Sequence, residues 1–144
     1  MLCGCAAAGV LAASSAAVTS PTARACPSVT VVNATLGTHS GAPVVTKTQY
    51  SKTCTYSGGG IGSTKITFEM DTLATFTAGE KAAGSLGAKI VKVHGLGVAA
   101  WTAGLGDIYV FDGHEQIKIL ALSLEIHSPS TATAKVEALA RKLL

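Results

Sequence analysis

The chain has 144 residues, of which 48% are hydrophobic, 5% aromatic and 13% charged. This length allows one domain with a single core, and the high hydrophobic share excludes a disordered chain. The low charged share suits a small extracytoplasmic protein. The net charge of +3 comes from scattered basic residues, of which only Arg141 and Lys142 are adjacent, so we expect no nucleic-acid partner.

An apolar, uncharged run over residues 5–18 is the first feature along the chain. It is followed by Thr22-Ala23-Arg24-Ala25, which ends in an A-x-A pattern directly before Cys26. These are features of a secretory signal peptide, and the run is shorter than the roughly 20 residues that span a bilayer. We therefore expect a leader over residues 1–25 and one secreted or cell-envelope domain over residues 26–144. The alternative is an Ala-rich helix buried in the domain.

The first four residues contain no basic side chain, although a signal peptide begins with one. We therefore expect the true start to lie upstream. Leu2-Cys3-Gly4-Cys5 also resembles a bacterial lipobox, and lipidation of Cys5 is the rival interpretation. Lipoprotein tethers are usually polar, whereas residues 6–18 are apolar, so release is favoured over anchoring. A lipid on Cys5 is the one membrane contact that we anticipate.

Cys26 and Cys54 are the two cysteines that lie outside the predicted leader. In an oxidising compartment, two cysteines without a third most simply form one bridge. We therefore predict a Cys26–Cys54 disulfide, with a reactive free thiol as the alternative. The domain has no C-x-x-C spacing, so neither a redox motif nor a zinc site is indicated.

The first half of the domain is predicted to contain one helix and three strands. Apolar residues at helical spacing over 28–36, with Gly37 as a C-cap, predict a short helix, although the β-branched content leaves a strand as the alternative. Alternating side chains predict strands over residues 44–49, 50–56 and 64–70, with the glycines of 58–62 as a hairpin connection.

The second half adds a helix, four strands and a closing helix. Residues 72–86 are helical in character, with Leu73, Phe76, Ala83 and Leu86 on or near one stripe. Strands are predicted over 89–94, 98–102, 108–111 and 116–124, the last after the hairpin signal Asp112-Gly113. Ser128 and Pro129 begin the closing helix. The order α-β-β-β-α-β-β-β-β-α predicts an α+β fold, an antiparallel sheet with helices packed mainly on one face.

Two glycine-rich segments resemble nucleotide-binding motifs. Residues 95–100 match the loose dinucleotide pattern G-x-G-x-x-A, and Asp112 lies near its expected acidic position. No crossover helix fits between them, because Gly104 and Gly106 interrupt the short intervening segment. Residues 58–65 lack the Gly-Lys-Ser/Thr order of a phosphate-binding loop. We therefore expect no nucleotide cofactor.

No local catalytic or metal-binding pattern is present either. His39, His94, His114 and His127 lie far apart, and there is no G-x-S-x-G motif. Glu69 and Asp71 are closely spaced, but a solvated strand edge explains them. We therefore expect no metal, no cofactor and no catalytic residue recognisable from spacing. Convergence of His94 with His114 in three dimensions stays open.

Trp101 is the candidate residue for ligand contact. It is the only tryptophan of the chain and stands beside Ala99, Ala100 and Ala103. A large aromatic side chain among small residues is typical of a core or of a pocket wall.

Several short motifs recur together in one order: Leu36-Gly37, Cys54-Thr55-Tyr56, Gly95-Leu96-Gly97 before Ala99-Ala100-Trp101, and Ala138-Leu139-Ala140. This order resembles small secreted proteins and lipoproteins of actinobacteria that are grouped in domain-of-unknown-function families. The resemblance covers nearly all of residues 26–144. It implies an extracytoplasmic compartment, this fold and a bridged cysteine pair, but no reaction. Those proteins often have Asp after Gly-Leu-Gly, where this chain has Val98; a Gly-Leu-Gly-Asp occurs later, at residues 104–107.

These observations favour an exported, non-catalytic and monomeric domain of the cell envelope or the secreted fraction, which binds a small ligand or a protein partner. The alternative is a secreted hydrolase whose site assembles only in three dimensions. A cleft that gathers His94 or His114 with a carboxylate and a hydroxyl would favour the hydrolase. An apolar cavity beside Trp101 with few polar groups would favour ligand binding.

Overall fold

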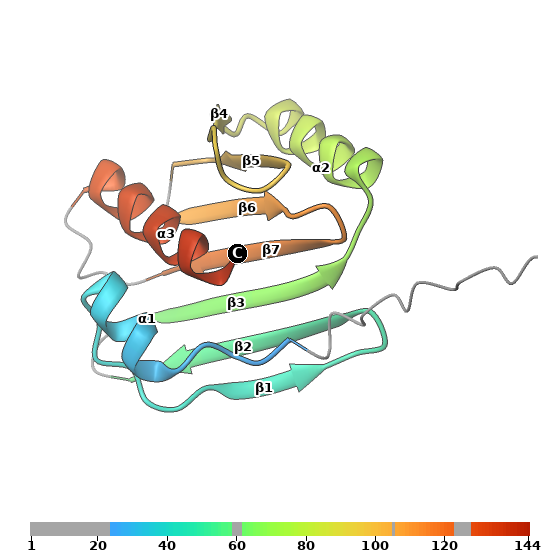
Figure 1. The fold of residues 1–144 in the computed structure, drawn as a ribbon. Coiled ribbons are helices and arrows are strands. Elements are labelled where there is room, and N and C mark those ends of the chain that lie inside the picture. Colours follow the sequence, from blue (N-terminus) through green and yellow to red (C-terminus); the bar gives the residue numbers. More distant parts are fainter. Residues whose placement is uncertain (1–23, 59–61, 105, 123–127) are drawn as a thin grey trace, which may run out of the picture.

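A seven-stranded antiparallel sheet forms the centre of the protein (Figure 1). The computed structural model describes residues 24–58, 62–104, 106–122 and 128–144. The strand order is β1-β2-β3-β7-β6-β5-β4, and the helices and strands follow one another as predicted, so the α+β class is confirmed. The elements are α1 (Val29–Leu36), β1 (Val44–Lys47), β2 (Ser51–Ser57), β3 (Ser63–Met70), α2 (Leu73–Ser85), β4 (Val91–Lys92), β5 (Ala99–Thr102), β6 (Asp107–Phe111), β7 (Glu115–Ala121) and α3 (Pro129–Leu143).

The predicted and observed boundaries differ mainly at strand ends. The strand predicted over residues 89–94 is reduced to the two residues of β4, and a loop with positive φ angles at Gly95 and Gly97 follows before β5. The strand predicted to end at residue 124 ends as β7 at Ala121, and residues 123 and 124 lie outside the described residues. The middle of the predicted 58–62 connection is likewise outside them.

Two of the three helices cover one face of the sheet. Figure 1 shows α1 and α3 together in front of the central strands. Val32 of α1 and Val136 of α3 are fully buried against side chains of one sheet face. The buried members of this core are Val32, Leu36, Cys54, Tyr56, Ile66, Phe68, Leu96, Ala100, Ile108, Val110, Ile117, Ile119, Ala121, Val136, Leu139 and Ala140. The prediction that helices pack mainly on one face is confirmed.

The helix α2 is the exception, because it packs on the opposite face. Its Phe76 contacts Trp101 and Phe111, which form a second, smaller hydrophobic cluster. Trp101 and Phe111 adjoin Ala100 and Val110 of the main core along their strands, and successive residues of a strand point to opposite faces. The second face is therefore covered by α2 at the β5 and β6 end.

The stripe predicted for α2 is only partly buried. Phe76 is 2% exposed, whereas Leu73 is 47% and Leu86 is 90% exposed. The reason is that α2 stands off the sheet along much of its length. Its small residues Gly79, Ala82 and Ala83 line an open groove instead of filling the space.

Each helix begins at a hydroxyl cap. The side chains of Ser28, Thr72 and Ser128 accept hydrogen bonds from backbone N–H groups three residues further on. Gly37 ends α1 with φ at 73°, in the left-handed region that glycine adopts without steric cost. The predicted N-cap at Ser128 and C-cap at Gly37 are confirmed.

The predicted disulfide between Cys26 and Cys54 is present and joins the entering chain to β2. A second link lies beside it, where the Tyr56 hydroxyl donates to the Pro27 carbonyl oxygen at 2.6 Å. The Lys52 ammonium also donates to the Arg24 carbonyl oxygen. The segment that precedes α1 is therefore held against the sheet by covalent and polar contacts. Among the described residues, no helix has the length and hydropathy that crossing a membrane would require.

Candidate ligand-binding groove

A groove of about 480 Å³ lies between α2 and the second face of the sheet. Its volume falls in the range of about 300–1,000 Å³ that is typical of small-molecule sites. Trp101, the candidate from the sequence, is part of its lining. The full lining is Glu69, Met70, Asp71, Thr75, Phe76, Gly79, Ala82, Ala83, Leu86, Trp101, Tyr109, Gln116 and Lys118.

Strand register decides which side chains meet on the sheet side of the groove. Directly paired residues of antiparallel strands share a face of the sheet. Trp101 pairs with Tyr109, and Tyr109 pairs in turn with Lys118. Gln116 pairs with Glu69 on its other side. An aromatic row on β5 and β6 therefore continues into a polar row on β7 and β3.

The aromatic part of the groove is closely packed. The rings of Trp101 and Tyr109 are stacked, with centroids 3.9 Å apart and an angle of 11° between their planes. Phe76 approaches Trp101 from α2 with a centroid distance of 6.4 Å. Burial and, to a lesser extent, the Asp107 carboxylate raise the pKa of the Tyr109 phenol, which is therefore neutral near pH 7. The floor of the groove is thus an uncharged aromatic surface.

The Trp101 side chain carries an unusual polar atom. The residue is 4% exposed, and its indole Nε1 has no hydrogen-bond partner among the residues that the structure describes. Buried polar atoms are nearly always paired, and an unpaired one costs about 1–3 kcal/mol. The protein therefore keeps this large aromatic ring in the groove wall despite an unfavourable polar contribution.

The polar part of the groove contains a charged pair and an amide. The Lys118 ammonium lies 2.6 Å from a Glu69 carboxylate oxygen, and both side chains are about one-third exposed. Gln116, which pairs with Glu69 on one side and Phe111 on the other, is only 8% exposed. Its carboxamide forms no hydrogen bond to another described residue, and its polar atoms stay accessible to solvent, since Trp101 Nε1 is the one fully buried and unpaired side-chain atom among the described residues. Glu69 and Asp71, predicted to lie at a solvated strand edge, line this groove.

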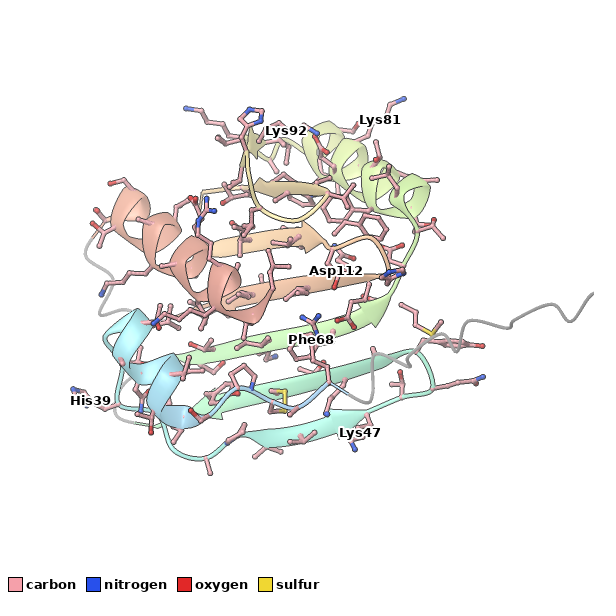
Figure 2. The ribbon with its side chains drawn as sticks, in the orientation of Figure 1. His39, Lys47, Phe68, Lys81, Lys92 and Asp112 are labelled. Atoms are coloured by element: carbon pink, nitrogen blue, oxygen red, sulfur yellow. A yellow bond between two sulfur atoms is a disulfide. The ribbon has the colours of Figure 1, made fainter. Side chains whose placement is uncertain are left out.

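A cluster of charged residues surrounds Arg24 on the other face of the sheet, beside the main core. The guanidinium lies 2.7 Å from Glu115 and 3.2 Å from Asp112, and it donates to the Leu143 carbonyl oxygen at 2.8 Å. It also stands over the ring of Phe68, a core residue, 5.5 Å from the centroid. Figure 2 labels Phe68 on β3 and Asp112 directly after β6. This cluster joins the entering chain, the sheet and the end of α3.

The Glu115 residue in this cluster is 7% exposed. Burial raises the pKa of its carboxyl group, and the nearby Asp112 carboxylate acts in the same direction, while Arg24 and His114 oppose the shift. Asp112 itself is used in the hairpin turn, because its other oxygen accepts from the backbone N–H groups of His114 and Glu115. Asp112 therefore stabilises the hairpin turn with one carboxylate oxygen and contacts Arg24 with the other.

The last glycine of each Gly-Leu-Gly motif lies close to another strand. A Cβ atom at Gly97 would lie 2.6 Å from the Phe111 carbonyl oxygen, and one at Gly106 would lie 2.8 Å from that of Ala121. Asp107 accepts from the Thr102 hydroxyl and the Ala103 N–H, which closes the β5–β6 turn. Close backbone packing therefore accounts for these glycines.

The histidines do not assemble with other catalytic groups in the hollows that we find. His94 lines a hollow of about 220 Å³ formed by residues 92–100, whose lining contains neither a carboxylate nor a hydroxyl. His39 and His114 are exposed, and His127 lies outside the described residues. Within the described ranges, no group of three or more His, Cys, Asp or Glu residues could hold a metal ion.

The sequence pointed to Trp101 but not to its neighbours in the groove. Phe76 was assigned to a helix stripe, and Tyr109 and Gln116 were assigned only to strands. One signal in the sequence could have pointed to Gln116, because it is a polar residue near the start of a strand. The structure shows that this strand, β7, is buried on both faces. The positions of Cys26 and Cys54 agree with the predicted bridge, while Cys5 lies outside the described residues.

Comparisons with protein-family models, with curated proteins and with solved structures found no match to this chain.

Proposed function

We propose that this protein is an exported, non-catalytic domain of the cell envelope or the secreted fraction, and that it binds a small molecule in the groove between α2 and the sheet. The observation that carries the proposal is the largely apolar groove of about 480 Å³ beside Trp101. A concave apolar surface with a few convergent polar groups is the usual form of a ligand site.

The compartment and the relationship to other proteins form part of the same proposal. The Cys26–Cys54 bridge is compatible with an oxidising compartment, where disulfides persist. The signal-like segment before Arg24 supports export, with release preferred to lipid anchoring at Cys5. The ordered motifs that end in Ala138-Leu139-Ala140 support a relationship to the actinobacterial domain-of-unknown-function families.

Binding explains the geometry better than hydrolysis does. A hydrolase needs a nucleophile, a base and an orienting group within hydrogen-bond reach of one another. The hollow at His94 brings no such groups together. A further cavity of about 560 Å³ between β4, β5 and α3 is lined by small and polar side chains without an aromatic surface. The groove at Trp101 is therefore the better supported site.

The test uses protein purified from its native culture and native mass spectrometry. We expect a non-covalent small molecule that departs on denaturation. Gly79→Leu should abolish its retention, because a Cβ at Gly79 meets open space within 4 Å and a longer side chain would enter the groove. Ala78→Leu, an exposed neighbour on α2 that does not line the groove, is the matched control. Equal loss or equal retention in both variants would contradict the assignment of the groove.

A further inference from the structure

Resting on the proposed function, we propose that the ligand is a flat, mainly apolar molecule with a neutral amide-like edge, in which a hydrogen-bond donor stands beside an acceptor. The Gln116 carboxamide binds this edge. The flat body lies against the aromatic surface that Tyr109 and Phe76 provide.

Gln116 supplies the first argument, because the residue is largely buried while its carboxamide stays accessible to solvent. It is 8% exposed, lines the groove and forms no side-chain hydrogen bond to any described residue. A carboxamide offers N–H donors and a carbonyl acceptor together. A ligand in the groove can bind the donor and the acceptor at once, and another amide-like edge is the complementary group.

The charges of the groove argue for a neutral ligand. Its lining contains two carboxylates, Glu69 and Asp71, and one ammonium group, Lys118. Lys118 is already paired with Glu69 at 2.6 Å. No lining cation is therefore left to balance Asp71 or to attract an incoming carboxylate. An anionic ligand would meet net repulsion, whereas a neutral amide would not.

The shape of the groove argues for a flat body. Tyr109 and Trp101 are stacked face to face, with centroids 3.9 Å apart and an angle of 11° between their planes, so an occupant meets the outer face or the edges of this stack, and a flat ring fits against either. On the opposite wall, Gly79, Ala82 and Ala83 leave a shallow space beside Phe76. Aromatic surfaces of this kind favour offset-stacked or edge-to-face contacts with another ring.

The sole tryptophan makes binding directly measurable. Trp101 lines the groove, so its fluorescence reports on an occupant without any label. We would titrate the full folded chain with 2-naphthamide, with naphthalene, which lacks the polar edge, and with 2-naphthoate, whose edge is anionic. We expect 2-naphthamide to bind about tenfold more tightly than naphthalene, the ratio that one net hydrogen bond provides. Binding of 2-naphthoate should be weaker than that of 2-naphthamide.

The Gln116→Leu variant isolates the amide. This change keeps a side chain of similar size and should remove the preference for 2-naphthamide over naphthalene. Equal affinities of the wild-type protein for 2-naphthamide and naphthalene, or a preference that survives Gln116→Leu, would overturn the ligand class but leave the groove as a binding site. Failure of all three probes to change the fluorescence would overturn the ligand class. The proposed function is tested separately: it would be overturned if the Gly79→Leu variant retained the native ligand as well as the wild-type protein does. The comparison of probes on the wild-type protein holds even if the variant does not fold.

Discussion

The Arg24 guanidinium lies 2.7 Å from the Glu115 carboxylate, so a residue of the entering chain neutralises a buried acid at the start of β7. Arg24 also contacts Asp112 and the last turn of α3. Without Arg24, the Glu115 carboxylate would lie near the like-charged Asp112 carboxylate in a partly desolvated place. Arg24 is therefore an integral part of the folded domain, although it lies before Cys26.

We expect Arg24→Ala to lower the free energy of unfolding by about 2 kcal/mol at pH 7, the size of a lost charged contact. The loss should shrink toward pH 4. Burial raises the native pKa of Glu115 above its ordinary 4.5, so native Glu115 binds protons more readily than unfolded Glu115, and stability falls as the pH rises through the native pKa. Arg24 lowers the pKa of Glu115, so removing Arg24 raises that pKa further and enlarges the loss of stability as the pH rises.

Urea unfolding at pH 4 and pH 7 measures this difference. In the double variant Arg24→Ala/Glu115→Gln the extra pH dependence should disappear, because position 115 no longer titrates. A deficit of equal size at both pH values would show that Glu115 is not the group responsible.

The residue at which the chain begins should affect stability. A chain beginning at Cys26 lacks Arg24, while one beginning at Ala23 retains it. We expect the longer chain to melt roughly 6–10 °C higher, since Arg24 contributes about 2 kcal/mol in a domain of this size. The chain from Ala23 that carries Arg24→Ala is the control and should melt like the shorter chain. Intact mass of the native protein then identifies which form occurs; cleavage before Cys26 stays a prediction until it is measured.

Removing the disulfide should destabilise the domain through the unfolded state. Cys26 and Cys54 are 28 positions apart in the sequence, and closing such a loop contributes about 3–4 kcal/mol in the chain-entropy model. We expect Cys26→Ser/Cys54→Ser to lower the urea midpoint accordingly. Cys3→Ser/Cys5→Ser should leave it unchanged. Two free thiols in the unreduced native protein would contradict the bridge.

Gly97 and Gly95 form a matched pair for testing close packing. Both have positive φ angles, 61° and 70°, so alanine is strained at each. Only at Gly97 does a neighbour stand in the way, because an added Cβ would lie 2.6 Å from the Phe111 carbonyl oxygen. We expect Gly95→Ala to cost about 1 kcal/mol and Gly97→Ala clearly more. Equal costs in thermal unfolding would show that the contact with β6 is unimportant.

Tyr56 should make the fold sensitive to alkali. Burial raises its pKa from 10.0 to about 12. The native phenol holds its proton more tightly than the unfolded one, so its contribution is present below pH 10 and is lost as the pH rises toward 12. Tyr56→Phe should cost about 1 kcal/mol at pH 7, where it removes the hydrogen bond to Pro27, and should weaken the decline above pH 10. Exposed Tyr50→Phe, followed by the same urea titrations, should change neither quantity.

The groove shows the limit of prediction from local pattern. Hydrophobic spacing places Phe76 on a helix, and alternation places Tyr109 and Gln116 on strands, but neither pattern tells which strands are neighbours. Gln116 reaches the groove because β7 pairs with β3 and β6 at a particular register. The distance between α2 and the sheet likewise depends on how deeply the Phe76 side chain is buried in the second hydrophobic cluster.

The order of the elements, the caps at Gly37 and Ser128 and the pairing of Cys26 with Cys54 follow from the amino-acid sequence alone. These features depend on residues a few positions apart, or on there being two cysteines to pair. The assembled fold was needed to show that α2 packs on the second face, that Gln116 is buried in the groove and that Arg24 neutralises Glu115. Such relationships join distant segments, and their energies arise from burial and charge proximity, which do not exist until the sheet is assembled.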